Sequence, residues 1–285
     1  MPPRKIPIEP VPTDLYPQQA HELFANRLSE LLDTGWSYLP DTQLDENFAE
    51  WQAAAAARPL SSAEKSWAET AMAGLRLDHA THEAHIPDTI ARSEITTHAY
   101  RLKHPALIPH DLVGLNAAGN QTPYEEVLGL NDFVCFSFAD HSPMRAKYHT
   151  VFKVPALAML ERPGTLVFPF DAPFAGAAYS LEENVARNQA MALRGTDYMQ
   201  LLPTYLAAER SGRQASELYP AWLSRSLYLP KSFQQAEIKV LGNLALDEVD
   251  WQLEVRGLSA QYEALTRQVD PAIVASRFID KSMSL

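Results

Sequence analysis

The hydrophobic pattern of this chain changes near Ile95, and this change restricts the fold more than any other feature of the sequence. Before Ile95, apolar residues recur at intervals of three to four positions, which is typical of amphipathic helices. After it, short apolar runs are separated by Pro, Gly and Asn, which favour strands joined by turns. Helices followed mainly by strands indicate the α+β class, with strands in antiparallel or mixed pairs.

The part before this change is expected to be a proline-rich arm followed by helices. Residues 1–13 are rich in proline and predict an extended arm, and helical spacing continues to about Leu77. Ser61 and Glu64 fit the start of a helix, because a hydroxyl and a carboxylate can bond free backbone amides there. We assign residues 1–90 to this arm and α-helical cap. The apolar positions at helical spacing before Ser61 are Leu23, Phe24, Leu28, Leu31, Leu32, Phe48 and Trp51.

A sheet with a helical insertion is expected after residue 90. The segment from Leu181 to Leu223 is rich in Ala, Leu, Glu and Arg and predicts the insertion, and the chain ends in a predicted helical tail. We assign residues 91–285 to one domain, whose core covers about residues 91–255. The expected strands are Leu112–Leu115, Asp132–Phe138, Thr150–Val154, Leu166–Phe170 and Glu237–Leu241.

Composition excludes several classes of protein. The chain has 285 residues, of which 46% are hydrophobic, so it can bury one large core. It contains no run of about twenty apolar residues, and prolines interrupt the N-terminus before a signal peptide could form, so we expect a cytoplasmic protein without a membrane partner. The net charge of −11 disfavours generic binding to a nucleic-acid backbone, although a local strip with Arg213, Arg225 and Lys231 remains compatible with a nucleic-acid substrate.

Metal and thiol chemistry are not expected. Cys135 is the single cysteine, which excludes an internal disulfide and a multi-cysteine zinc site, and its apolar neighbours predict a buried, inert thiol. His79, His82 and His85 follow a three-residue spacing that would place them on adjacent faces of a helix. Without a second cluster of ligands, this series predicts a solvated helix end and no metal.

A carboxylate at the start of a predicted strand is the strongest candidate for chemistry. Glu237 opens a segment with the period of a strand and follows an irregular loop, residues 224–232. From the spacing alone, an exposed glutamate at a strand edge is the favoured interpretation.

Three segments in the same chain order resemble the ADP-ribosyltransferase superfamily, and in particular the DarT-like toxins. Phe233–Leu244, with Gln-Ala-Glu at its start, resembles the family's last motif. Leu130–Met144 resembles the central strand, because an aromatic run leads into Ser-Pro-Met. Ile95–Arg101, followed by Gly-Leu at residues 114–115, is similar to the first strand, and Val167–Ala178 is a weaker fourth match. The resemblance covers roughly residues 94 to 250.

This resemblance implies that NAD is the substrate that donates ADP-ribose, with no metal. Glu237 would be the catalytic carboxylate that stabilises positive charge on the ribose. His98, presented from a strand beside Thr97, would hold NAD through a ribose hydroxyl or the nicotinamide side. A histidine bonded to the backbone is the alternative for His98. Phe136 and Phe138 lie on one face of the predicted strand and would stack on nicotinamide beside Ser137, or would belong to the core.

The sequence departs from the family at one arginine. DarT-like enzymes carry an Arg between the first and central strands that serves the NAD pyrophosphate and catalysis, whereas residues 116–131 contain none. Arg101 and Arg145 are the nearest substitutes, and a guanidinium suits a pyrophosphate better than an ammonium does.

The acceptor side is expected in the loop before Glu237. Tyr228 would stack on a base, Arg225 and Lys231 would contact phosphate, and Gln235 would orient the acceptor; a solvated connector is the alternative. The resemblance implies mono-ADP-ribosylation of a nucleic-acid base by a toxin or phage-defence effector that an antitoxin or immunity partner restrains. A protein acceptor and a non-catalytic binding module that keeps the fold are the alternatives.

Overall fold

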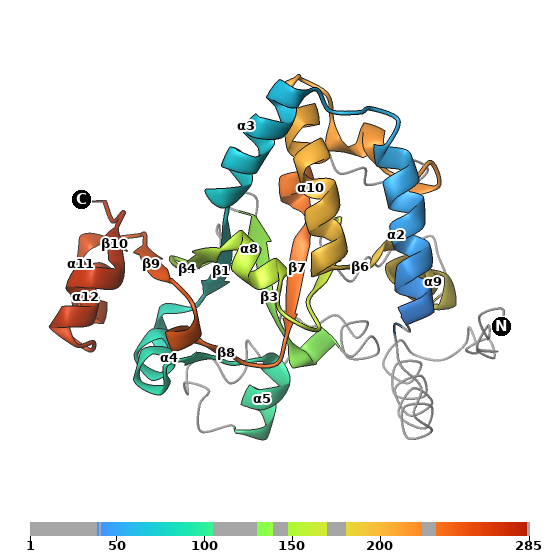
Figure 1. Ribbon diagram of the computed structural model, residues 1–285. Coiled ribbons are helices and arrows are strands. Elements are labelled where there is room, and N and C mark those ends of the chain that lie inside the picture. The colour runs from blue at the N-terminus through green and yellow to red at the C-terminus, as the bar shows by residue number, and fades with distance from the viewer. Residues whose placement is uncertain are drawn as a thin grey trace.

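The computed structural model describes residue 39 and residues 41–104, 130–138, 148–169, 181–223 and 232–283. These residues form an α+β fold in which a mixed eight-stranded sheet packs against helices (Figure 1). The predicted fold class is therefore confirmed at this level. The predicted arm, the helix over Leu23 to Leu32 and the strand Leu112–Leu115 lie outside the described residues.

The sheet is antiparallel except at one edge, where β10 runs parallel to β9. The predicted strands β3, β4, β5 and β7 are all present. A separate two-stranded sheet joins β2 (Glu94–Ile95) to β8 (Leu244–Ala245). The order across the main sheet is β10 (Phe278–Asp280), β9 (Gln252–Val255), β4 (Thr150–Pro155), β1 (Arg76–Thr81), β3 (Phe133–Phe138), β7 (Glu237–Leu241), β5 (Leu166–Phe168) and β6 (Leu193–Arg194).

The N-terminal helices α2 (Asp41–Ala55) and α3 (Ser62–Ala73) confirm the predicted helical cap. Ser61 caps α3, because its side chain accepts from the amide of Glu64 while the Glu64 carboxylate accepts from the amide of Ser61. The predicted capped start is thus correct.

Polar contacts fix α2 near the opposite edge of the sheet from β10. Asn47 donates from Nδ2 to two backbone carbonyls at the end of α9 (Leu181–Met191), at 2.7 and 2.8 Å. Arg194 of β6 bonds the carboxylates of Asp41 and Asp45 at 2.9 and 2.8 Å. In Figure 1, α2 and α9 accordingly lie beside β6, whereas α11 (Ser259–Thr266) and α12 (Pro271–Arg277) lie beside β10.

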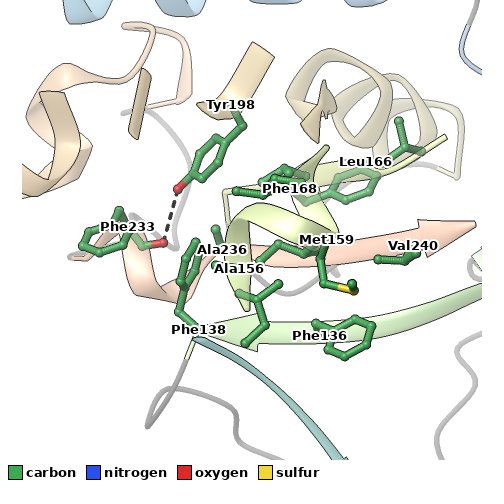
Figure 2. Packing of buried hydrophobic residues seen from close by; sticks show 14 of the residues in the cluster. Phe136, Phe138, Ala156, Met159, Leu166, Phe168, Tyr198, Phe233, Ala236 and Val240 are labelled. Carbon is green, nitrogen blue, oxygen red and sulfur yellow. Dashed lines mark hydrogen bonds between the residues drawn. The ribbon is translucent and has the colours of Figure 1, made fainter. Parts of the chain in front are cut away.

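The predicted helical insertion is confirmed, and its main helix packs against the sheet. α10 (Gly195–Arg210) contacts α2, α3, α8 (Ala156–Leu160) and β5. Gly195 is required at its start, because an added Cβ would lie 2.2 Å from the carbonyl oxygen of Leu160. Tyr198 of α10 packs near Phe138 of β3, and Figure 2 shows both rings in the buried cluster above the sheet.

Several features of the sheet were missed from the sequence, among them β9 and β6. β1 lies inside the predicted helical cap but pairs with β3 and β4 in the middle of the sheet. His79 is therefore on a strand, so the expected helix over His79, His82 and His85 is wrong there. β10 returns from the predicted helical tail to the sheet edge. The remaining short helices are α4 (Ile86–Arg92), α5 (His98–Lys103) and the 3-10 turns Glu83–His85, Leu130–Asp132, Ala215–Leu218, Phe233–Gln235 and Leu246–Glu248.

Candidate functional site

A row of polar side chains crosses four neighbouring strands in the middle of the sheet. Lys153 of β4 is paired with Asp78 of β1, Asp78 with Ser137 of β3, and Ser137 with Glu237 of β7. Side chains of directly paired residues point to the same face of a sheet. This row therefore places two carboxylates, a hydroxyl and an ammonium on one face.

One end of the row is a compact charge network. The ammonium of Lys153 lies 3.1 Å from Oδ1 of Asp78 and 3.5 Å from Oε2 of Glu254 on β9. Asp78 is 1% exposed and Glu254 is also buried. Buried carboxylates require such a cation, because burying an unpaired charge is costly. This end of the row has an evident structural role.

At the other end, Glu237 keeps contact with solvent beside a buried lysine. Its side chain is 17% exposed, and Oε1 lies 3.2 Å from the ammonium of Lys239, which is fully buried. The same ammonium lies 3.1 Å from Sγ of Cys135, which pairs with Lys239 across β3 and β7. The carboxylate proposed from the sequence therefore lies on the sheet face beside a cation.

Ser137 contributes a hydroxyl without a hydrogen-bond partner. Its Oγ is buried and bonds nothing in the described part of the chain, although Ser137 lies between Asp78 and Glu237 in the register. Buried polar atoms are nearly always hydrogen-bonded in native proteins, so an unbonded one marks a place where a ligand group can bind.

His79 has another buried atom without a partner, on the opposite face of β1 from Asp78. Its Nδ1 lies 2.9 Å from the carbonyl oxygen of Cys135, and its ring packs against Phe136 at 5.6 Å. Burial, and to a smaller degree the charge of Arg101, lower the pKa of His79 to about 4, so the ring is neutral near pH 7. A carbonyl only accepts, so Nδ1 must carry the proton. Nε2 is then a buried acceptor, and it has no partner among the described residues.

Arg101 brings positive charge close to His79. The guanidinium donates from Nε to Oγ1 of Thr96 at 2.9 Å and from Nη2 to the carbonyl oxygen of Thr96 at 3.1 Å. Burial lowers the pKa of Arg101. Its charge also acts on His98, whose pKa is lowered first by burial and then by Arg101. Arg101, a predicted substitute for the family's arginine, is therefore close enough for its charge to act on both histidines.

His98 is positioned differently from the prediction. It begins α5 and does not lie on a strand, because Thr97 caps this helix by accepting from the amide of Tyr100 at 3.2 Å. The amide of Thr97 donates to Oδ1 of Asn243 at 2.9 Å, which ties α5 to the turn after β7. Nε2 of His98 is nevertheless buried and has no partner in the described ranges. Thr97 has a clear structural role, and its contact with NAD stays a prediction.

The two predicted aromatic contacts belong to the core. Phe136 and Phe138 are each 1% exposed, on the opposite face of β3 from Ser137. Phe138 packs edge to face on Phe233 at 5.3 Å (Figure 2). The alternative of core packing is confirmed for both rings, and their burial does not favour stacking on nicotinamide.

The segment before Glu237 is fixed by hydrogen bonds between α10 and the backbone of Phe233. The amide of Phe233 donates to Oε1 of Glu209 at 3.1 Å, and its carbonyl oxygen accepts from the hydroxyl of Tyr198 at 3.5 Å (Figure 2). Gln235 is exposed, and its Oε1 accepts from the amide of Ser232 at 3.4 Å. α10 thus fixes the approach to β7 while Gln235 stays accessible for the predicted acceptor role.

Four of the predicted site residues lie outside the described residues, namely Arg145, Arg225, Tyr228 and Lys231. Of the others, Glu237 and Ser137 are brought together in the register, and Arg101 lies near His98. Asp78 and Lys239, which share a face with Glu237, were not predicted from the sequence as members of the site. For Lys239 a signal was present, because residues two apart on a strand share a face and Glu237 had already been placed on that strand.

Comparison with known proteins does not assign this chain to a family. No family model matches this sequence, and no curated protein is significantly similar to it.

In the ranges that the structure describes, no group of three His, Cys, Asp or Glu side chains is arranged to hold a metal ion. None of the helices described is both long and apolar enough to cross a membrane.

Proposed function

We propose that this protein is a mono-ADP-ribosyltransferase that transfers ADP-ribose from NAD to a macromolecule. The observation that carries the proposal is the pairing of Glu237 with Ser137, whose buried hydroxyl has no hydrogen-bond partner among the described residues. A solvent-accessible carboxylate beside an unsatisfied hydroxyl suits a ligand with hydroxyl groups, such as the riboses of NAD.

The proposed chemistry is substitution at the ribose carbon that carries nicotinamide. The bond between that carbon and nicotinamide breaks, and nicotinamide leaves with the bonding electrons. The carboxylate of Glu237 stabilises the positive charge that develops on the ribose. The acceptor atom attacks from the opposite face, forms the new bond with inversion and loses its proton.

Ser137, Arg101 and His98 have binding roles in this proposal. The hydroxyl of Ser137 bonds a ribose hydroxyl on the same face of the sheet as Glu237. Arg101 supplies the positive charge for the pyrophosphate. His98, whose buried Nε2 has no partner among the described residues, is the proposed histidine contact for NAD.

The proposed acceptor is a nucleic-acid base, in keeping with a toxin or phage-defence role and an antitoxin or immunity partner. Its support is the resemblance of the Gln-Ala-Glu segment at residues 235–237, in which Gln235 is exposed. The net charge of −11 favours a protein acceptor as the second candidate, because an acidic surface repels nucleic acid.

Release of nicotinamide from NAD tests the proposal. Wild-type protein and Glu237→Gln are incubated with NAD alone and with DNA, RNA or a protein extract. We expect release by the wild type that rises with one acceptor class and falls at least about a hundredfold in Glu237→Gln. Glu263→Gln, an exposed glutamate on α11, is the matched control and should retain wild-type activity. Equal release by the wild type and Glu237→Gln would refute the role of Glu237.

A further inference from the structure

Lys239 is a lysine whose side chain is fully buried in the middle of the sheet. It lies on β7 between Ile238 and Val240, which are also fully buried. Lysine side chains are almost never fully buried unless they are paired, because removing the ammonium from water is costly. Its position therefore requires an explanation beyond the strand pattern.

The partners of Lys239 are a carboxylate and a thiol. Nζ lies 3.2 Å from Oε1 of Glu237 and 3.1 Å from Sγ of Cys135. Cys135 is paired with Lys239, and Ser137 with Glu237, so these four side chains share one face of two adjacent strands. The ammonium is thus directly beside the carboxylate that the proposed function uses.

Stability alone does not account for this lysine. Methionine has a similar length and no charge, so it would fill this place in the core without the cost of burying an ammonium. Glu237, in contrast to Asp78, keeps contact with solvent, so water can solvate its carboxylate without a buried cation. The ion pair is therefore better explained by its effect on the position of the Glu237 carboxylate than by a contribution to the stability of the core.

We propose that Lys239 is a positioning residue that holds the carboxylate of Glu237 in the orientation needed beside Ser137. This inference rests on the proposed function and deepens it. A glutamate side chain has three rotatable bonds, and the ammonium restricts them through one fixed contact. A displacement of a reacting group by about 1 Å can lower a rate by about a hundredfold.

The test compares the wild type with Lys239→Met, which keeps the length of the side chain and removes its charge. We expect the kcat for nicotinamide release to fall about ten- to hundredfold, with the KM for NAD changed less than about threefold. The melting temperature should change little, because the Glu237 carboxylate that loses the ammonium still contacts solvent. A lysine with only a structural role would leave kcat unchanged or lower it only together with the melting temperature, and either result would overturn the proposal.

A crystal structure of each protein separates failure of this inference from failure of the proposed function. If the wild type releases no nicotinamide, the proposed function fails, and the position of Glu237 still decides the inference. We expect the Glu237 carboxylate to be displaced or spread over several rotamers in Lys239→Met. A carboxylate in the same place in both structures would overturn the role of Lys239. Lys65→Met, an exposed lysine on α3, controls for loss of charge.

Discussion

The two ends of the polar row differ in how their polar atoms are satisfied. At the β4 end, Lys153 bonds Asp78 and lies beside Glu254, and all three side chains are at most 14% exposed. At the β7 end, Glu237 keeps contact with solvent, and Ser137 next to it has an unbonded hydroxyl. This difference shows that the charges at the β4 end hold the sheet together. At the β7 end, the carboxylate and the unbonded hydroxyl can still bind a ligand.

Removing the cation of the first network should have the largest effect on stability. Lys153→Met leaves Asp78 and Glu254 without their shared ammonium, so we expect the free energy of unfolding to fall by about 3 kcal/mol. Urea denaturation at neutral pH measures it. Ser137→Ala, at the other end of the row, should change the free energy of unfolding by less than about 1 kcal/mol, because its hydroxyl has no hydrogen-bond partner among the described residues to lose. Equal effects of the two substitutions would remove the distinction between the two ends.

His79 should make the protein less stable in acid. Burial lowers its pKa from 6.5 to about 4 in the folded protein, so between these values the unfolded chain binds a proton that the folded chain does not. This contribution is complete above about pH 6.5 and is lost as the pH falls toward 4, with a total of up to about 3 kcal/mol.

The matching variant is His79→Phe, which keeps the ring contact with Phe136 and removes the titrating nitrogens. We expect its urea midpoint to fall less than that of the wild type between pH 7 and pH 4.5. An identical fall in both proteins would show that His79 is not held neutral by its surroundings.

The smallest predicted effect concerns Cys135 and reports on the ammonium beside it. A nearby cation favours the reactive thiolate, so iodoacetamide should alkylate Cys135 several times more slowly in Lys239→Met than in the wild type at the same pH. The protein has one cysteine, so mass spectrometry follows this thiol alone. Equal alkylation rates in the two proteins would show that the charge of Lys239 does not act on Cys135, which would contradict the contact in the structure.

Local patterns predicted the parts of the fold that depend on local physics. Alternation along β3 and β7 predicted both strands, and Ser61 with Glu64 predicted the start of α3. β1 was missed because Asp78 interrupts its apolar pattern, and this buried carboxylate is paired with Lys153, 75 residues away in the chain. No local signal contains that pairing.

The candidate site, too, could be predicted only where local patterns determine it. Glu237 and Ser137 follow from strand patterns together with the resemblance. The acceptor state of His79 follows from its contact with the carbonyl of Cys135, 56 residues away, and could not be predicted locally. The expected strand at His98 failed because Thr97 has a high strand propensity and also caps helices, and tertiary contact with Asn243 decides between the two.

Calorimetric titration with NAD tests most directly whether the β7 end of the row is a ligand site. We would titrate Glu237→Gln, which removes turnover, and the double variant Ser137→Ala with Glu237→Gln. We predict saturable binding to the first protein and about tenfold weaker binding to the second, because the hydroxyl of Ser137 no longer bonds the ligand. Absence of binding to Glu237→Gln and to the wild type, or equal affinity in both variants, would contradict a ligand site at this end of the row.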